Sequence, residues 1–500
     1  MLRGLSPRGT REVPPRSKKP VFAPSCGSLP HLAQGVTARG FLGLLAARVQ
    51  HASDMRSWLV AMAAVGVAAG LAPLAKSDSR RSGSPDPSAS GSAIVLPSIA
   101  LTGSVSGVEH TAARLAAESA VQDLSGLNLA RIGLGDDGAT APLGPGRTAR
   151  LTVDPVLQGI ATAAMRARHI PEATVVLLDP QSGEVLVYAS HIEQGPLRDL
   201  AVEARAPAAS VFKIITASAL VDDAGLGPDT RQCYSGGEER ILPSDLIDNP
   251  ARDRWCVTLG GAMGRSVNAV FARLASKHLD PARLERAASH FGFGQPVAFD
   301  TKVEPSTLHI PEGGLAFART AAGFWNTPLS PLHAAWISAA LERGGDPVRP
   351  FIVRQVVSRD GTVTEVPPRV ATHTPLVTTT TAAAVTSMME HTVSEGTSFR
   401  AFHDGRRTPF LPGLTVAGKT GTLTDDHAQR YYTWFTGFAP SHPVEGVRPI
   451  AVAVLVVNGP SWRVKANVLA REVLQGYFAE QKVPGVSRPR ISSARVDDSD

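Results

Sequence analysis

The sequence has few aromatic residues and few cysteines, and its histidines show no spacing typical of a metal site. Aromatic side chains make up 5% of the 500 residues, and the three cysteines are Cys26, Cys233 and Cys256. The 14 histidines form no ligand-spaced cluster such as His-Glu-x-x-His. Metal catalysis therefore has little support, and we expect no metal and no other cofactor.

An excess of positive charge is also missing from most of the chain. Residues 1–56 hold nine Lys or Arg and two acidic residues, whereas the remaining residues hold 41 basic and 42 acidic ones. The net charge of +6 is therefore a property of the N-terminal tail. A protein that binds nucleic acid needs a basic surface on its folded domain. Charge thus gives no support to a nucleic-acid partner.

One apolar run is long enough to cross a bilayer. Trp58 to Ala75 contains no charged side chain, and Lys76 ends the run. Such a run can span the membrane as a single helix, and the basic tail before it should remain cytoplasmic. We expect a single-pass anchor in the cytoplasmic membrane, with the rest of the chain on the periplasmic side. A cleaved signal peptide is the alternative, which Pro73 disfavours because it is poorly placed for cleavage after Ala72 or Ala75.

Composition divides the chain into six segments. A serine-rich, flexible linker follows the apolar run, and a stretch with one expected helix, near His110 to Leu124, follows the linker. Met55 is an alternative start, which would leave residues 1–54 outside the natural protein. The segments are a basic tail (1–57), an anchor or signal segment (58–75), a linker (76–93), a small pedestal or linker (94–150), the main domain (151–483) and a disordered polar tail (484–500).

The main domain has an α/β pattern. Asp154-Pro155 is typical of a helix start, and apolar residues then recur at helical spacing. Thr174–Leu178 and Glu184–Ala189 predict a hairpin. Near the other end, two strands are predicted at Trp434–Phe438 and Ile450–Val457, and an apolar stripe from Val464 to Phe478 predicts a last helix. We expect one mixed unit whose sheet joins both ends of the domain, with helix-rich sequence between them.

Cys233 and Cys256 flank a polar stretch of 22 residues beyond the predicted anchor. An exported compartment permits disulfides, so we expect a bond between them. Closure of this loop would stabilise the fold by roughly 3 kcal/mol. Two unpaired thiols are the alternative.

A serine and a lysine one helical turn apart form the first chemical motif, Ser210-Val211-Phe212-Lys213. The apolar run from Val211 to Val221 predicts a buried helix, which places Ser210 at its N-terminus, where developing negative charge is stabilised. Burial lowers the pKa of a lysine, and a neutral Lys213 could accept the serine proton. The alternative is a helix-capping serine beside a surface lysine.

Two further motifs contain hydroxyl, amide and amine groups. Ser266-Val267-Asn268 lies between three glycines and an apolar helix, at a loop–helix junction that can face a cleft. Lys419-Thr420-Gly421-Thr422 lies in a predicted strand, where the glycine lets a substrate backbone approach and the polar groups suit a carboxylate. For the Ser266 motif, the alternative is a helix-capping serine with a neighbouring Asn. For the Lys419 motif, it is an edge-strand lysine with a glycine bulge.

Together, in this order, the three motifs resemble the signature of the penicillin-recognising serine enzymes. Their spacing resembles the high-molecular-mass penicillin-binding proteins, and the resemblance covers about residues 150–480. It implies a β-lactamase/transpeptidase-like fold, an antiparallel sheet flanked by helices with a mainly helical subdomain. Further matching segments are Thr152–Gln158, Leu178–Leu186, Ser330–Ala335, Gly344-Gly345, Val393–Thr397 and Trp434–Pro440.

The resemblance implies a monofunctional serine D,D-transpeptidase that cross-links peptidoglycan stem peptides ending in D-Ala-D-Ala. Ser210 would attack the carbonyl of the penultimate D-Ala and be acylated by β-lactams. Lys213 would accept its proton, and Ser266 would relay a proton to the leaving D-Ala.

The resemblance also implies a substrate-binding set. Asn268 would hold the substrate amide, while Lys419, Thr420 and Thr422 would bind the terminal carboxylate beside Gly421. The backbone N–H groups of Ser210 and Thr422 would form the oxyanion hole.

Three other functions stay open on the same residues. The chain could be a D,D-carboxypeptidase, or a β-lactamase whose water is activated by Glu304 in a Glu-Pro loop. A membrane-bound sensor of β-lactams or peptidoglycan, without catalysis, is the non-enzymatic alternative.

Overall fold

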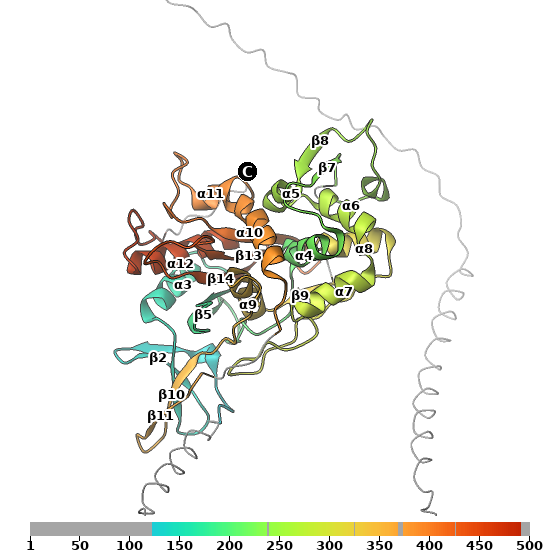
Figure 1. Cartoon of the computed structure of the whole chain (residues 1–500). Coiled ribbons are helices and arrows are strands. Elements are labelled where there is room, and N and C mark those ends of the chain that lie inside the picture. Colours follow the sequence, from blue (N-terminus) through green and yellow to red (C-terminus); the bar gives the residue numbers. More distant parts are fainter. Residues whose placement is uncertain (1–122, 238–239, 325, 369–373, 426, 492–500) are drawn as a thin grey trace, which may run out of the picture. The chain divides into compact units, whose positions relative to one another are not determined.

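The computed structural model describes residues 123–237, 240–324, 326–368, 374–425 and 427–491 (Figure 1). The predicted basic tail, apolar run and linker lie outside these residues, as does nearly all of the helix predicted near His110. In the part of the chain that the structure describes, every helix is too short or too polar to cross a membrane.

The central sheet has five antiparallel strands in the order β12-β13-β14-β4-β5. Strand β14 from the C-terminal part pairs with β4 from the start of the domain, for example Val454 opposite Val175. The prediction that the sheet joins both ends of the domain is therefore confirmed. The strands are β4 (Glu172–Leu178), β5 (Val185–Ile192), β12 (Ala417–Asp425), β13 (Arg430–Ala439) and β14 (Ile450–Asn458).

Both faces of this sheet are covered by helices. Helix α9 (Pro331–Glu342) contacts β4, β13 and β14, while α12 (Ala466–Glu480) contacts β13 and β14 and packs on α3 (Pro155–Arg166). Alternate residues of β4 therefore enter different cores, since Val175 belongs to the cluster with α3 and α12 and Val176 to the one with α9. Burial on both faces explains why the central strands are almost wholly apolar.

Helix α3 begins where the sequence predicted. The carboxylate of Asp154 accepts hydrogen bonds from the backbone N–H groups of Val156 and Leu157, and Pro155 occupies the first helical position. Such a cap satisfies N–H groups that have no partner within the helix. Ser330 caps α9 in the same way, through the N–H of His333.

A mainly helical region lies beside the sheet, on the right of Figure 1. Helix α4 lies at its centre and packs against α6, α7 and α10. This is the predicted helical subdomain. Its elements are η3 (Ala209–Phe212), α4 (Lys213–Ala224), η4 (Pro243–Leu246), α5 (Leu259–Arg265), α6 (Asn268–His278), α7 (Pro281–His290) and α8 (Gly314–Ala321). Helix α10 (Thr379–Ser394) contacts both α4 and β12, and the short helix α11 (Phe399–Phe402) packs on α10 and α12.

A second sheet combines segments that are far apart in the sequence. Strand β3 pairs with β10, with Ala149 opposite Val356. These strands were not predicted, because they are short and the early ones contain few β-branched residues. The sheet consists of β1 (Gly133–Gly135), β2 (Gly138–Pro142), β3 (Thr148–Leu151), β10 (Val353–Val357) and β11 (Val363–Glu365), preceded by η2 (Leu129–Arg131).

Two small strand pairs complete the fold. Strands β6 (Ala206–Pro207) and β9 (Pro328–Leu329) pair with each other, and β6 ends shortly before Ser210 in the sequence. Strands β7 (Arg231–Tyr234) and β8 (Trp255–Thr258) form a hairpin in which Cys233 lies opposite Cys256, and these two residues are joined by a disulfide bond.

The predicted polar tail begins at Pro484, and the structure describes its first residues. Val486 and Ile491 pack against the core formed by α3, α12 and the sheet. An ion pair of 3.0 Å joins Arg488 to Glu480 of α12. Residues 484–491 therefore run along the domain, and residues 492–500 lie outside the described part.

Candidate active site

We had expected Ser210 at the N-terminus of an α-helix. In the structure it lies in a short 3-10 turn. This turn, η3, leads directly into α4. A hydrogen bond from Ala208 N–H to Thr327 O holds the chain before Ser210, and Ala209 adopts a φ of 50°. Gly323 packs so closely that a Cβ there would lie 2.2 Å from Ala209 O, so only glycine fits. The Ser210 backbone is thus held by its neighbours.

The amine of Lys213 contacts three oxygen atoms. Its Nζ lies 2.7 Å from Ser210 Oγ, 2.7 Å from Asn268 Oδ1 and 2.6 Å from Ala322 O. The amide and carbonyl oxygens can only accept hydrogen bonds. A neutral amine therefore donates both of its hydrogens to them and directs its lone pair at the hydroxyl of Ser210. In this state Ser210 is the donor and Lys213 is placed to take its proton.

The surroundings of Lys213 favour this neutral state. The side chain is fully buried, and its Nζ lies 5.6 Å from the centre of the Phe271 ring. Burial lowers the pKa of Lys213 well below the ordinary lysine value, and the positive charge of Lys419 lowers it further. Phe271 comes from α6, so a segment distant in the sequence contributes to this burial.

The second motif lies at a sharp junction between two helices. Ser266 ends α5 in the left-handed conformation, with φ of 58°, and α6 begins at Asn268. Non-glycine residues rarely adopt this conformation, and they do so mainly where surrounding structure requires it. Ser266 and Asn268 line the same cleft as Ser210. We had expected a loop–helix junction that can face a cleft, and the structure has a helix on both sides of the junction.

Lys419 lies opposite Lys213, on the edge strand β12. Its Nζ donates to Ser266 Oγ at 2.8 Å and to Thr420 O at 2.8 Å. The side chain is fully buried, and burial lowers the pKa of Lys419 to about 7. At neutral pH this group therefore retains part of its positive charge, which a bound carboxylate would stabilise.

Gly421 lets β12 approach the turn that holds Ser210. A Cβ at this position would lie 3.0 Å from Ala208 O and 3.2 Å from the Cβ atoms of Ala209 and Trp434. The indole Nε1 of Trp434 donates to Pro207 O at 2.8 Å, which ties β13 to the same turn. We had expected the glycine to make room for a substrate backbone, and it also makes room for the chain before Ser210.

A cavity of about 380 Å³ brings the three motifs together. Lys213 and Lys419 lie behind the residues that line this cavity. Lys213 contacts Ser210, and Lys419 contacts Ser266. The predicted residues that line it are Ser210, Ser266, Asn268, Thr420, Gly421 and Thr422.

Other residues of this cleft were not among our candidates. The hydroxyls of Thr397 and Thr420 lie 2.6 Å apart, and Asn467 Nδ2 donates to Thr397 O at 3.4 Å. Trp434, Lys465 and Asn467 also line the cavity. Thr397 lies in one of the segments that resembled the family, but the sequence offered no signal for Lys465 or Asn467.

Carboxylates are absent from the described residues that line this cavity. Glu304, the hypothetical activator of water, instead accepts a hydrogen bond from Ala204 N–H at 3.0 Å and pairs with Arg205 at 3.5 Å. It thus contacts the loop before β6. Among the described residues, His, Cys, Asp and Glu form no group that could hold a metal ion.

Known proteins match both the sequence and the fold. The family model described as the penicillin-binding protein transpeptidase domain matches residues 173–475. The peptidoglycan D,D-transpeptidase PbpA of Mycobacterium tuberculosis is 27% identical over 349 residues, which cover 62% of this chain and 67% of that protein.

Two solved structures show the same fold. The D,D-transpeptidase domain of a peptidoglycan glycosyltransferase from Eggerthella lenta is 22% identical, with a TM-score of 0.54, and the match covers 70% of this chain and 95% of that one. The imipenem acyl-enzyme complex of penicillin-binding protein A from M. tuberculosis is 24% identical, with a TM-score of 0.52 and coverage of 66% and 79%.

Proposed function

Because this chain belongs to the penicillin-binding protein transpeptidase domain family, we propose that it is a serine D,D-transpeptidase of peptidoglycan. It cross-links stem peptides ending in D-Ala-D-Ala through an acyl-enzyme, and β-lactams inhibit it covalently. The observation that carries the proposal is the position of Lys213 Nζ, 2.7 Å from Ser210 Oγ and bonded to two acceptors. This arrangement makes Ser210 a nucleophile with an adjacent base.

Acylation follows from these contacts. Ser210 Oγ attacks the carbonyl carbon of the penultimate D-Ala, and its proton passes to the lone pair of Lys213. The N–H groups of Ser210 and Thr422 stabilise the negative charge on the carbonyl oxygen. Asn268 orients the peptide amide and also holds the Lys213 amine in place.

The leaving D-Ala is held by the opposite wall. Lys419, Thr420 and Thr422 bind its carboxylate, and Gly421 keeps β12 close to Ser210. Ser266, which accepts a hydrogen bond from Lys419, relays to the leaving amine the proton that Lys213 took from Ser210 when the C–N bond breaks, so that Lys213 is neutral again after acylation.

The lining of the cleft favours transfer to an amine over hydrolysis. Deacylation by water needs a base that activates the water, and a carboxylate is missing from the described lining. Glu304 is bound to Ala204 and Arg205 instead. We therefore favour transpeptidation over β-lactamase activity as the function. Rapid, repeated turnover of nitrocefin by the enzyme would instead favour β-lactamase activity.

We further propose that the Trp58–Ala75 run anchors the protein in the cytoplasmic membrane, with the catalytic domain on the periplasmic side. The lack of charge over this run supports an anchor. The Cys233–Cys256 bond supports a compartment that permits disulfides. We propose no nucleic-acid partner, since the basic residues in excess are all in the N-terminal tail.

Covalent labelling with a fluorescent penicillin tests the function. The intact mass should increase by one penicillin per chain, and peptide mapping should place the adduct on Ser210. Ser210→Ala should abolish the increase, whereas Ser394→Ala, at an exposed serine of α10, should leave it unchanged. An adduct on the Ser210→Ala protein, or none on the parent, would refute the assignment.

A further inference from the structure

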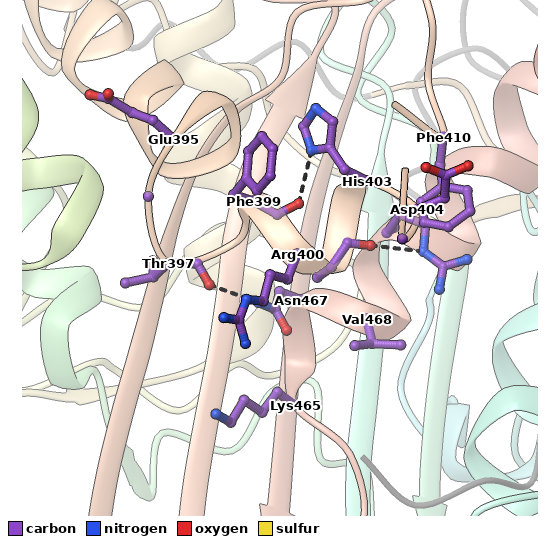
Figure 2. Close-up of a pocket in the computed structure, with 14 residues that line it drawn as sticks. Glu395, Thr397, Phe399, Arg400, His403, Asp404, Phe410, Lys465, Asn467 and Val468 are labelled. Carbon is purple, nitrogen blue, oxygen red and sulfur yellow. Dashed lines mark hydrogen bonds between the residues drawn. The ribbon is translucent and has the colours of Figure 1, made fainter. Parts of the chain in front are cut away.

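A second, larger cavity adjoins the cleft that contains Ser210 (Figure 2). It has a volume of about 720 Å³ and lies between the segment after α10, the short helix α11 and the start of α12. Thr397, Lys465 and Asn467 line both cavities. The larger cavity, which we call the side pocket, therefore adjoins the reaction cleft and shares part of its wall.

The side pocket opens where the leaving group is held. The proposed carboxylate site includes Thr420, whose hydroxyl lies 2.6 Å from that of Thr397. Thr397 in turn lines the side pocket. In a D-Ala-D-Ala peptide the terminal carboxylate belongs to the leaving residue. The pocket thus extends the cleft on the leaving-group side of the scissile bond, and not on the side of the acyl donor.

The reaction itself requires an entry for a second substrate on this side. Aminolysis of the acyl-enzyme is the chemical reverse of the step that expels D-Ala, so the attacking amine takes the position that the leaving amine vacated. A peptide that carries this amine needs space beyond that position for the rest of its chain. The side pocket supplies such space next to Thr397 and Thr420.

The charges of the side pocket favour an acidic peptide. The carboxylate of Glu395 is bound to His391 at 2.8 Å, and that of Asp404 accepts the N–H groups of Arg406 and Thr408. Both acids therefore have local partners that reduce their effect on a ligand.

The side pocket is also lined by cations. Arg471 is fixed by Gln475 and by the ring of Phe410. Arg400 is exposed and Lys465 is half-buried, and Figure 2 shows both near Thr397 and Asn467. Guanidinium and ammonium groups at this position suit carboxylates.

We propose that the side pocket is the subsite for the acceptor: it binds a stem peptide through carboxylates and directs the peptide's amine at the acyl-Ser210 carbonyl. This inference rests on the proposed function. The amine nitrogen forms a bond to the carbonyl carbon, the C–Oγ bond breaks, and the amine proton returns to Ser210 Oγ through Lys213. The product is a peptide cross-link and free enzyme.

Filling the side pocket is the first test. Gly405 lines it and has no unusual φ, and no atom lies within 4 Å of the position that a Cβ would take, so a side chain can be introduced there without backbone strain. Gly405→Trp should raise the acceptor concentration for half-maximal cross-linking about tenfold or more. Gly405→Ala, which adds one methyl group, is the matched control and should resemble the parent.

Removing one cation is the second test. The probe is a synthetic stem tripeptide with a diamino acid at its third position, compared with a twin in which the carboxylates away from the reacting amine are amidated. Arg400→Gln should raise the half-maximal concentration of the acidic tripeptide about fivefold to tenfold, because charge-assisted hydrogen bonds are lost. The amidated twin should show little change. Arg359→Gln, at an exposed arginine in the turn between β10 and β11, is the control.

The readouts separate this inference from the proposed function. With a depsipeptide donor, the division of acyl-enzyme between hydrolysis and cross-linking reports on the acceptor, while fluorescent penicillin reports on Ser210 alone. Normal penicillin labelling of Gly405→Trp and Arg400→Gln with weakened acceptor use supports the subsite. Unchanged acceptor use in both variants, or an equal loss of penicillin labelling, overturns it. Failure of the parent protein to react with penicillin would instead refute the proposed function.

Discussion

The amines of Lys213 and Lys419 are both fully buried, and the positive charge of Lys419 helps to lower the pKa of Lys213. The two lysines face opposite walls of the cleft, since Lys213 contacts Ser210 while Lys419 contacts Ser266. A neutral amine therefore faces the nucleophile, and a group that still carries charge near neutral pH faces the carboxylate site. The two lysines have different roles because of this electrostatic coupling.

Removing the Lys213 amine tests its role as the base. Lys213→Ala should lower the rate of acylation by penicillin by about 10²–10⁴ or more, the usual effect of losing a general base. The measurement is the time course of covalent labelling, with thermal unfolding as a check of the fold. Lys419→Ala should act partly through weaker binding, which appears as a higher half-saturating penicillin concentration. Labelling of Lys213→Ala at the parental rate would contradict the mechanism.

The pH dependence of acylation should report on Lys419. Binding of a carboxylate needs the protonated form, and the pKa of Lys419 is lowered to about 7 in the free enzyme. The second-order rate constant should therefore fall as pH rises through about 7, because this constant follows the pKa values of the free enzyme. Lys419→Arg retains its proton at every pH tested and should move the fall to higher pH. An identical alkaline limb in both proteins would be evidence against this role.

The contact between Thr397 and Thr420 should position the carboxylate site. Thr397→Val keeps the shape but removes a hydroxyl that lies 2.6 Å from Thr420 Oγ1. Loss of one such hydrogen bond should raise KM for a D-Ala-D-Ala peptide about threefold to tenfold, with a smaller change in kcat. Thr397→Ser restores the hydroxyl and should rescue KM. A purely structural role would predict no such rescue, and a lower kcat with unchanged KM would also argue against positioning.

The bond between Cys233 and Cys256 should stabilise the domain. It closes a loop with a sequence separation of 23 residues. Replacing both cysteines by serine should lower the free energy of unfolding by about 3 kcal/mol, as loop closure predicts. Urea denaturation measures the change, with Cys26→Ser as the control. Peptide mapping without reductant should recover the linked pair, and recovery of two alkylated thiols from the native protein would refute the bond.

Local patterns in the sequence were sufficient to predict the framework of the domain. The Asp154-Pro155 start, the apolar, β-branched-rich runs of β4 and β5 and the apolar stripe of α12 each depend on neighbouring residues, so their secondary structure follows from the sequence. The strands β1 to β3 could not be predicted, because they are short and lack β-branched patterning, and β3 depends on pairing with β10 some 200 residues later.

For the site, the sequence by itself determined which hydroxyl, amide and amine groups are available and their order in the three motifs. Only the tertiary structure decided their relations. Packing of α6 and of the residues after α8 against α4 surrounds Lys213 with Phe271, Asn268 and Ala322. The pKa of a buried amine depends on such neighbours and on exclusion of water, which no local pattern specifies. Likewise, Asn467 and Lys465 join the cleft because the first turn of α12 lies next to Thr397, a contact between segments about 70 residues apart.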